Sequence, residues 1–177
     1  MVTLSKPAYD EILGYLEPGK RIVVDGLDGL GKTTFATLVA KKLGLEYVYF
    51  MKLDTIEKTL ASWKHVPKKA VVDRSVIATI CYSFDLDTSE KYHERVLSLL
   101  ANDNVVLFLP SNVKDHELIA KDEIFAGDVK KVRWVHDCMT SFGVSITNAV
   151  NVYTNFKGHS TRSLEQVLSS FKNQRYP

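Results

Sequence analysis

The residues best suited to chemistry lie in a short stretch rich in glycine. Residues 26–33 have the sequence GLDGLGKT, which satisfies the pattern GxxxxGK[ST]. Glycines let successive backbone N–H groups point at one anion, and the N-terminus of a following helix adds about half a positive charge. In such a loop the lysine reaches the β- and γ-phosphates of a nucleotide, and the next hydroxyl ligates Mg²⁺. The residues predicted to bind the phosphates of ATP are Gly26, Gly29, Leu30, Gly31, Lys32, Thr33 and Thr34.

A carboxylate and a guanidinium follow a second apolar run, residues 70–73. The carboxyl end of a strand in a parallel sheet is where ligands bind, so Asp73 and Arg74 are expected beside the glycine-rich loop. Asp73 can hold Mg²⁺ through water together with Thr33, and Arg74 offers a planar fork for a second phosphate. Lys32, Asp73 and Arg74 are therefore the candidate catalytic residues, and Thr33 and Asp73 the candidate metal site.

Asp28 places a negative charge inside a loop that is expected to bind phosphates. A carboxylate there is repelled by a triphosphate unless it faces another group. A sugar hydroxyl or a water on Mg²⁺ would suit it. Lys32, by contrast, is expected to point into the phosphate site when no nucleotide is bound.

Short apolar runs alternate with helical patterns along the chain. The runs are residues 21–25, 46–50, 70–73, 105–109 and 150–153, and the helical patterns are 32–43, 55–64, 76–84, 88–100, 128–142 and 163–173. Runs that are apolar nearly throughout are typical of strands buried on both faces of a parallel sheet. The alternation predicts one α/β domain over residues 1–177, preceded by an amphipathic helical extension at 1–19.

Composition excludes several classes of protein. The chain has 177 residues, 45% of them apolar and 25% charged, which is close to the average for globular domains. A net charge of +2 gives no field that would favour nucleic acid or a membrane surface as a partner. There is no apolar run of about 18 residues and no secretory leader. With two cysteines in no metal-binding spacing, a cytoplasmic location is expected.

The two motifs together resemble those of thymidylate kinases. The stretch VDGLDGLGKTT is similar to their phosphate-binding loop, and DRSVIATICYS, residues 73–83, is similar to their pattern DRYxxSSxAYQ. The resemblance implies a three-layer fold with a five-stranded parallel sheet of order 2-3-1-4-5. It also implies ATP and Mg²⁺ as cofactors, a nucleotide as the small-molecule substrate, and a homodimer, for which the helix at 76–84 is the candidate contact.

The resemblance implies the acceptor site as well. Asp28 would contact the sugar of the acceptor nucleotide, and Arg74 and Tyr82 match family positions as they stand. Phe50 and Lys52 occupy the place of the family's Arg-Glu-Pro segment. Trp63 and Lys64 are the candidates to replace a Phe-Arg pair that holds the base and its phosphate.

Two departures concern specificity. Ser75 stands where the family has a tyrosine that crowds the 2′ position, and Ser83 replaces a glutamine that contacts the base. Because both residues are smaller than their counterparts, tolerance of more than one acceptor is expected.

Two further regions complete the predicted site. A short lid is expected over residues 111–133, with Lys121 and Arg133 among its cations. Phe156 and Lys157 follow the fifth apolar run, where kinases with this loop commonly bind adenine.

These features predict an ATP-dependent kinase that converts dTMP or a related (deoxy)nucleoside monophosphate to the diphosphate. The first alternative is a deoxynucleoside kinase. Such a kinase is expected to have a glutamate at the end of the second strand, whereas this chain has Lys52 there. A polynucleotide 5′-kinase is a second alternative, although a net charge of only +2 indicates no obvious groove for a nucleic-acid strand. A GTPase-type switch is a third alternative, but proteins of that class require a DxxG motif beyond the phosphate-binding loop and an NKxD motif, and neither occurs in the sequence.

Overall fold

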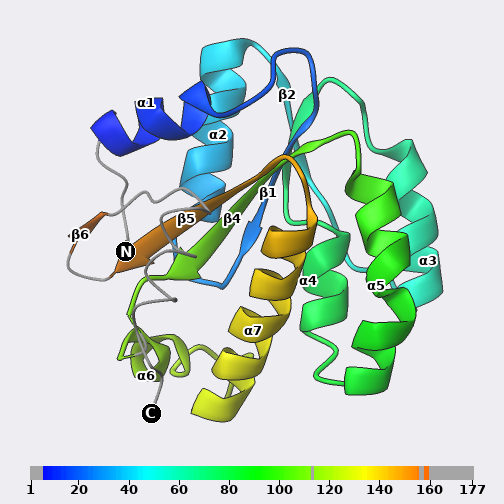
Figure 1. Cartoon of the computed structure of the whole chain (residues 1–177), viewed down its shortest axis with the longest axis vertical. Helices are drawn as coiled ribbons and strands as arrows, with labels where there is room; N and C mark the ends of the chain where they lie inside the picture. Colours follow the sequence, from blue (N-terminus) through cyan, green and yellow to red (C-terminus); the bar gives the residue numbers. More distant parts are fainter. Residues whose placement is uncertain (1–5, 113, 156–157, 160–177) are drawn as a thin grey trace.

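Every expected apolar run forms a strand of one sheet in the computed structural model (Figure 1). The structure describes residues 6–112, 114–155 and 158–159. The strands are β1 (Ile22–Gly26), β2 (Glu46–Tyr49), β3 (Ala70–Asp73), β4 (Asn104–Pro110) and β5 (Ala149–Asn155). They are parallel and lie in the order β2-β3-β1-β4-β5, which confirms the predicted topology. A short strand not foreseen in the sequence, β6 (Gly158–His159), pairs antiparallel with the outer edge of β5.

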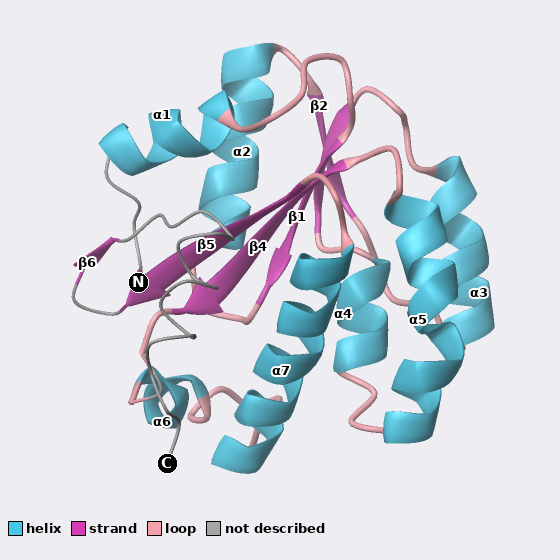
Figure 2. Cartoon of the chain, in the orientation of Figure 1, coloured by secondary structure: helices cyan, strands magenta, loops and turns pink. Residues whose placement is uncertain are grey.

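Helices cover both faces of this sheet (Figure 2). They are α1 (Lys6–Gly14), α2 (Lys32–Leu43), α3 (Ile56–Ser62), α4 (Val76–Cys81), α5 (Leu86–Leu100), α6 (Asp115–Ile119) and α7 (Val129–Ser145), with a 3₁₀ turn, η1 (Trp63–His65), after α3. Successive residues of β4 show the layering. Phe108 packs on Phe35 of α2, with ring centroids 5.4 Å apart, whereas Leu107 lies against Gly143 of α7 on the opposite face. Because both faces are covered, β1 and β4 are buried along their whole length.

Helix boundaries differ from the sequence pattern by a few residues, for local reasons. The pattern over 76–84 stops at Cys81, because the chain turns at Tyr82 and Phe84 takes a positive φ of 52°. The pattern over 128–142 continues to Ser145, with the Asp128 side chain capping its first turn. The N-terminal pattern forms only α1, which packs on α2 through Tyr9 and Phe35. The helix predicted at 163–173 lies outside the described residues.

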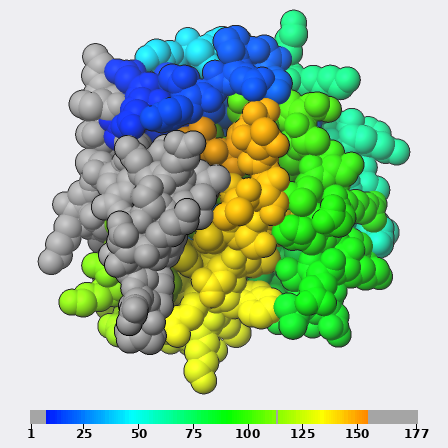
Figure 3. All heavy atoms as spheres, viewed as in Figure 1, coloured from blue at the N-terminus to red at the C-terminus, as the bar shows by residue number. Residues whose placement is uncertain are grey.

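The helix expected to mediate a dimer is covered within the chain. All six residues of α4 are buried, and α3, α5 and α7 pack around it. Figure 3 shows α5 and α7 side by side on the surface of this face. Cys81 of α4 and Cys138 of α7 are free thiols whose sulfurs lie 2.8 Å apart, so the two cysteines are neighbours where α4 packs on α7. This burial argues against α4 as a contact between subunits, and the homodimer stays a prediction.

Among the described helices, none is both long and apolar enough to cross a lipid bilayer.

Candidate phosphate and acceptor site

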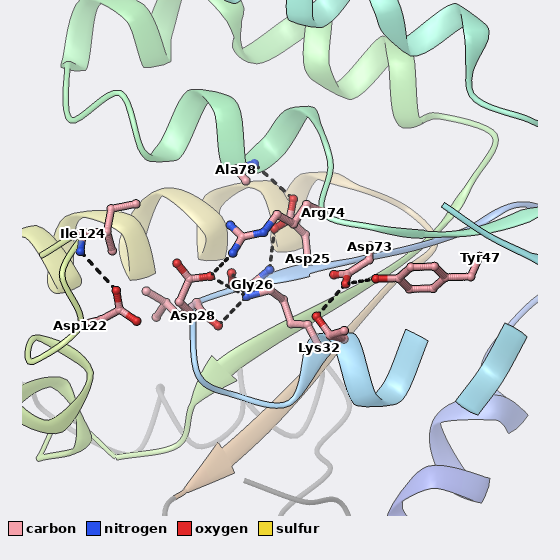
Figure 4. Close-up of polar contacts among 12 residues, drawn as sticks. Asp25, Gly26, Asp28, Lys32, Tyr47, Asp73, Arg74, Ala78, Asp122 and Ile124 are labelled. Carbon is pink, nitrogen blue, oxygen red and sulfur yellow. Dashed lines mark hydrogen bonds and ion pairs between the residues drawn. The ribbon is translucent and has the colours of Figure 1, made fainter. Parts of the chain in front are cut away.

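The glycine-rich loop connects β1 to α2 at the carboxyl edge of the sheet (Figure 4). Gly26 has φ of 138°, and a Cβ built there would lie 2.2 Å from the carbonyl oxygen of Phe108 in β4. Only glycine allows the two strands to approach so closely at this point. Gly31 takes a left-handed conformation at the N-cap of α2. Leu27 and Leu30, both buried, anchor the loop in the core, so the turn is held on both sides.

Lys32 does not point freely into the site. Its ammonium donates to the carbonyl oxygens of Gly26 at 2.9 Å and Leu27 at 2.8 Å, and it contacts Asp28 Oδ1 at 3.2 Å. Only 6% of the residue is exposed, and this burial lowers the pKa of Lys32. The expectation of a lysine projecting into the phosphate site is wrong, because loop carbonyls and one carboxylate fold the ammonium back.

Asp28 contacts both Lys32, which was expected to bind the phosphates of ATP, and Arg74, which was expected to bind a second phosphate. Its Oδ1 accepts a hydrogen bond from Arg74 Nη2 at 2.7 Å and also contacts the Lys32 ammonium. We expected this carboxylate to face a sugar hydroxyl or metal-bound water. In the structure it lies between a lysine and an arginine, where opposite charges replace the water lost on burial. Lys32 and Arg74 therefore converge on a single oxygen atom.

Asp73 is fully buried, and its two oxygens differ sharply. Oδ2 accepts hydrogen bonds from Thr33 Oγ1 and from Tyr47 Oη, both at 2.7 Å. Oδ1 is buried with no hydrogen-bond partner. Burial and the bond to Asp73 raise the pKa of Tyr47 to about 12, so the phenol remains a donor at neutral pH. A buried carboxylate oxygen without a partner, beside a threonine hydroxyl, provides the hard oxygen ligands that Mg²⁺ prefers.

Other metal sites have no support from the described part of the chain. No group of three or more His, Cys, Asp or Glu side chains is placed there so as to hold an ion. Asp73 and Thr33 remain the residues that would hold Mg²⁺.

Arg74 adopts a backbone conformation unusual for its type. Its φ is 70°, although its N–H continues the sheet by donating to Val24 O at 2.8 Å. A non-glycine residue with positive φ is often found where function requires a particular side-chain direction. The guanidinium lies over the ring of Tyr49, 5.9 Å from its centroid, at the wall of a cavity of about 190 Å³.

The cavity contains most of the predicted acceptor residues. Phe50, Lys52, Arg74 and Tyr82 all line it. Tyr49 and Ile124 also line it, and neither was foreseen, because Tyr49 is on an exposed edge strand and Ile124 is in an irregular loop. Burial raises the pKa of Tyr82, which keeps this phenol neutral.

Trp63 is not available to hold a base. It is only 2% exposed and packs edge-on behind Phe50, with ring centroids 4.9 Å apart. The guanidinium of Arg21 covers its ring at 4.6 Å. Phe50, and not Trp63, lines the cavity, so the proposed replacement by Trp63 is wrong.

Ser75 has a structural contact that the sequence did not reveal. Its hydroxyl donates to Asp25 Oδ2 at 2.6 Å and accepts from the N–H of Ile77, which caps α4. Asp25 is fully buried at the end of β1, and its carboxylate also accepts from the N–H groups of Gly26 and Ala78. Burial raises the pKa of Asp25. Ser75 therefore fixes the geometry of two loops, in addition to being smaller than a tyrosine.

The segment predicted as a lid approaches the cavity through apolar side chains. Ile124 lines the cavity, and Phe125 is fully buried against Tyr82 and Phe84, with centroids 5.8 and 6.5 Å away. Lys121 and Arg133 are exposed and do not line the cavity. The predicted adenine residues, Phe156 and Lys157, lie outside the described residues.

Comparison with known proteins supports the fold. Neither a family model nor a curated protein sequence matches the chain. A similar solved structure is the YorR protein from Bacillus subtilis, determined in complex with phosphorylated GDP. The two chains are 17% identical, and the match covers 89% of this chain and 99% of that one with a TM-score of 0.57. The chain thus has the three-layer α/β fold predicted for it, whereas the resemblance to thymidylate kinases rests on residues alone.

Proposed function

We propose that the protein is an ATP-dependent kinase whose acceptor is a nucleoside monophosphate, dTMP or a related (deoxy)nucleotide. The observation that carries this proposal is the single Asp28 oxygen held by both Lys32 and Arg74. A lysine of the phosphate-binding loop and an arginine from the next strand thus meet at one point. Two phosphates bound by these cations would be adjacent, as transfer of a phosphoryl group between them requires.

Each charged residue has a defined task in this proposal. Lys32 would neutralise the β- and γ-phosphates of ATP, and the backbone N–H groups of the loop would hold their oxygens. Thr33 and Asp73 would hold Mg²⁺, which supplies neutralisation of charge on the phosphates when it is bound. Arg74 would bind the phosphate of the acceptor, and Phe50 and Tyr82 would line the space for the rest of that nucleotide.

A phosphorylated acceptor explains the polar groups better than a free nucleoside does. Transfer to a nucleoside hydroxyl is helped by a carboxylate that accepts its proton. The segment after β2 that lines the cavity supplies Phe50 and Lys52 instead. A cation at this place suits an acceptor that already carries negative charge. The YorR protein, similar in fold, was solved with a phosphorylated nucleotide, which agrees with this class of ligand.

The proposal is tested by incubating the protein with ATP, Mg²⁺ and a panel of common nucleosides and their monophosphates, then separating the products by chromatography. We expect a diphosphate from at least one monophosphate and no product from the nucleosides. A monophosphate formed from a nucleoside would instead identify the deoxynucleoside kinase alternative.

Lys32→Ala should lower turnover at least about 100-fold, because one preorganised electrostatic contact to the transferred group is lost. Lys42→Ala is the matched control, since Lys42 is on the same helix but half exposed and paired with Asp10. Turnover close to that of the unmodified protein in a folded Lys32→Ala variant would exclude the proposed role of the loop.

A further inference from the structure

Tyr47 makes a contact to the candidate metal carboxylate that neither sequence motif includes. It lies on β2, the edge strand, and its hydroxyl donates to Asp73 Oδ2 at 2.7 Å (Figure 4). In the register of the sheet Tyr47 is opposite Val71, two residues before Asp73. The phenol therefore reaches forward along β3 to meet the carboxylate at the edge where the strands end.

Two hydroxyls share one oxygen of Asp73 and leave the other free. Thr33 and Tyr47 both donate to Oδ2, while Oδ1 is buried without a partner. A carboxylate held from two directions cannot rotate about its terminal bond without breaking both hydrogen bonds. Since an unpaired buried oxygen costs free energy, an arrangement that keeps it unpaired is expected where a ligand satisfies it.

We propose that Tyr47 is a positioning residue that orients Asp73 so that Oδ1 faces the Mg²⁺ of bound MgATP. This inference rests on the proposed function. Thr33 is itself a candidate metal ligand, so its hydroxyl would have two tasks, whereas the Tyr47 hydroxyl, within the described part of the chain, donates its hydrogen bond to Asp73. Partners that orient a metal-binding carboxylate commonly change metal affinity 10- to 100-fold when they are removed.

If Tyr47 had a purely structural role, removing its hydroxyl would leave metal binding unchanged. β2 is already held to β3 by parallel pairing over Glu46–Tyr49. Tyr49, two residues further along the strand, provides the comparison, because its ring lies under Arg74 and not against Asp73. Removing either hydroxyl keeps the aromatic ring, so only loss of the Tyr47 hydroxyl should affect the metal.

The test measures Mn²⁺ binding to the complex of the protein with a non-hydrolysable ATP analogue, by electron paramagnetic resonance. Tyr47→Phe is expected to weaken Mn²⁺ about tenfold while binding of the analogue without metal stays the same. Tyr49→Phe, the matched control for metal binding, should leave Mn²⁺ affinity unchanged. Equal Mn²⁺ affinity in Tyr47→Phe and the unmodified protein would overturn the inference.

A double-mutant cycle shows whether Tyr47 acts through Asp73. In an Asp73→Asn background, adding Tyr47→Phe should cause no further loss of Mn²⁺ affinity, since the group that Tyr47 orients is no longer a carboxylate. A further loss of the same size as in the unmodified background would overturn the inference and leave the kinase proposal intact. If the unmodified protein binds neither the analogue nor Mn²⁺ with it, the proposed function itself fails.

Discussion

Asp28 is the residue whose environment differs most from what its position suggests. A negative charge among phosphates is unfavourable, yet its carboxylate is only 14% exposed and contacts two cations. The same contacts neutralise Lys32 and Arg74 while no phosphate does so. An anionic ligand that binds Lys32 and Arg74 would therefore compete with the Asp28 carboxylate for these two cations.

Asp28→Asn should raise the affinity for inorganic pyrophosphate about tenfold, because the amide keeps the size of the side chain but competes less for the two cations. Calorimetric titration with pyrophosphate checks this. Pyrophosphate has no sugar, so a residue that acts only on a sugar hydroxyl would leave its affinity unchanged. Asp10→Asn, which removes an exposed partner of Lys42, is the control.

The strands were largely predictable, since those buried on both faces, such as β1 and β4, have short and nearly continuous apolar sequences. β3 and α2 match their patterns residue for residue. Asp73 and Arg74 could be placed in the site from the sequence, because they come at the carboxyl end of a strand that the sequence already predicts. Contacts between segments far apart in the sequence could not be predicted. Tyr47 contacts Asp73, which lies 26 residues further along the chain. Ile124 lines the cavity from a loop that has no periodic pattern.

In the loop between α6 and α7, Phe125 connects the predicted lid to Tyr82, which lines the cavity beside Arg74. Phe125→Leu should raise the KM for the acceptor severalfold and leave ATP binding unchanged, because Tyr82 loses a ring that packs against it. The expected cost in stability is about 1–2 kcal/mol.

Phe142→Leu is the matched control, as Phe142 is equally buried but stacks on His93. Steady-state kinetics of both variants make the comparison. An equal rise of the acceptor KM in both would mean that general loosening, and not the contact to Tyr82, is responsible.

For the whole molecule, one buried imidazole makes stability depend on pH. Burial, with smaller contributions from the charges of His136 and Arg133, lowers the pKa of His116 to about 4. The unfolded chain takes up a proton as the pH falls below about 6.5, whereas the folded chain does not until about pH 4, so stability decreases with falling pH across that range.

His116→Phe should flatten this dependence. Between pH 7.5 and pH 5 the unmodified protein is expected to lose about 2 kcal/mol more of its free energy of unfolding than the variant. Urea unfolding at the two pH values measures both. Parallel losses in the two proteins would show that His116 is protonated as easily in the folded chain as in the unfolded one.

The left-handed backbone of Arg74 has a consequence for how this protein can change over evolution. With φ of 70°, position 74 would be occupied with less strain by glycine than by any other residue. Selection for stability alone would therefore favour glycine there, and a function of the guanidinium would oppose it. A descendant with glycine at position 74 would keep the fold, lose the cation that faces Asp28, and mark a lineage in which the chemistry of this site is no longer under selection.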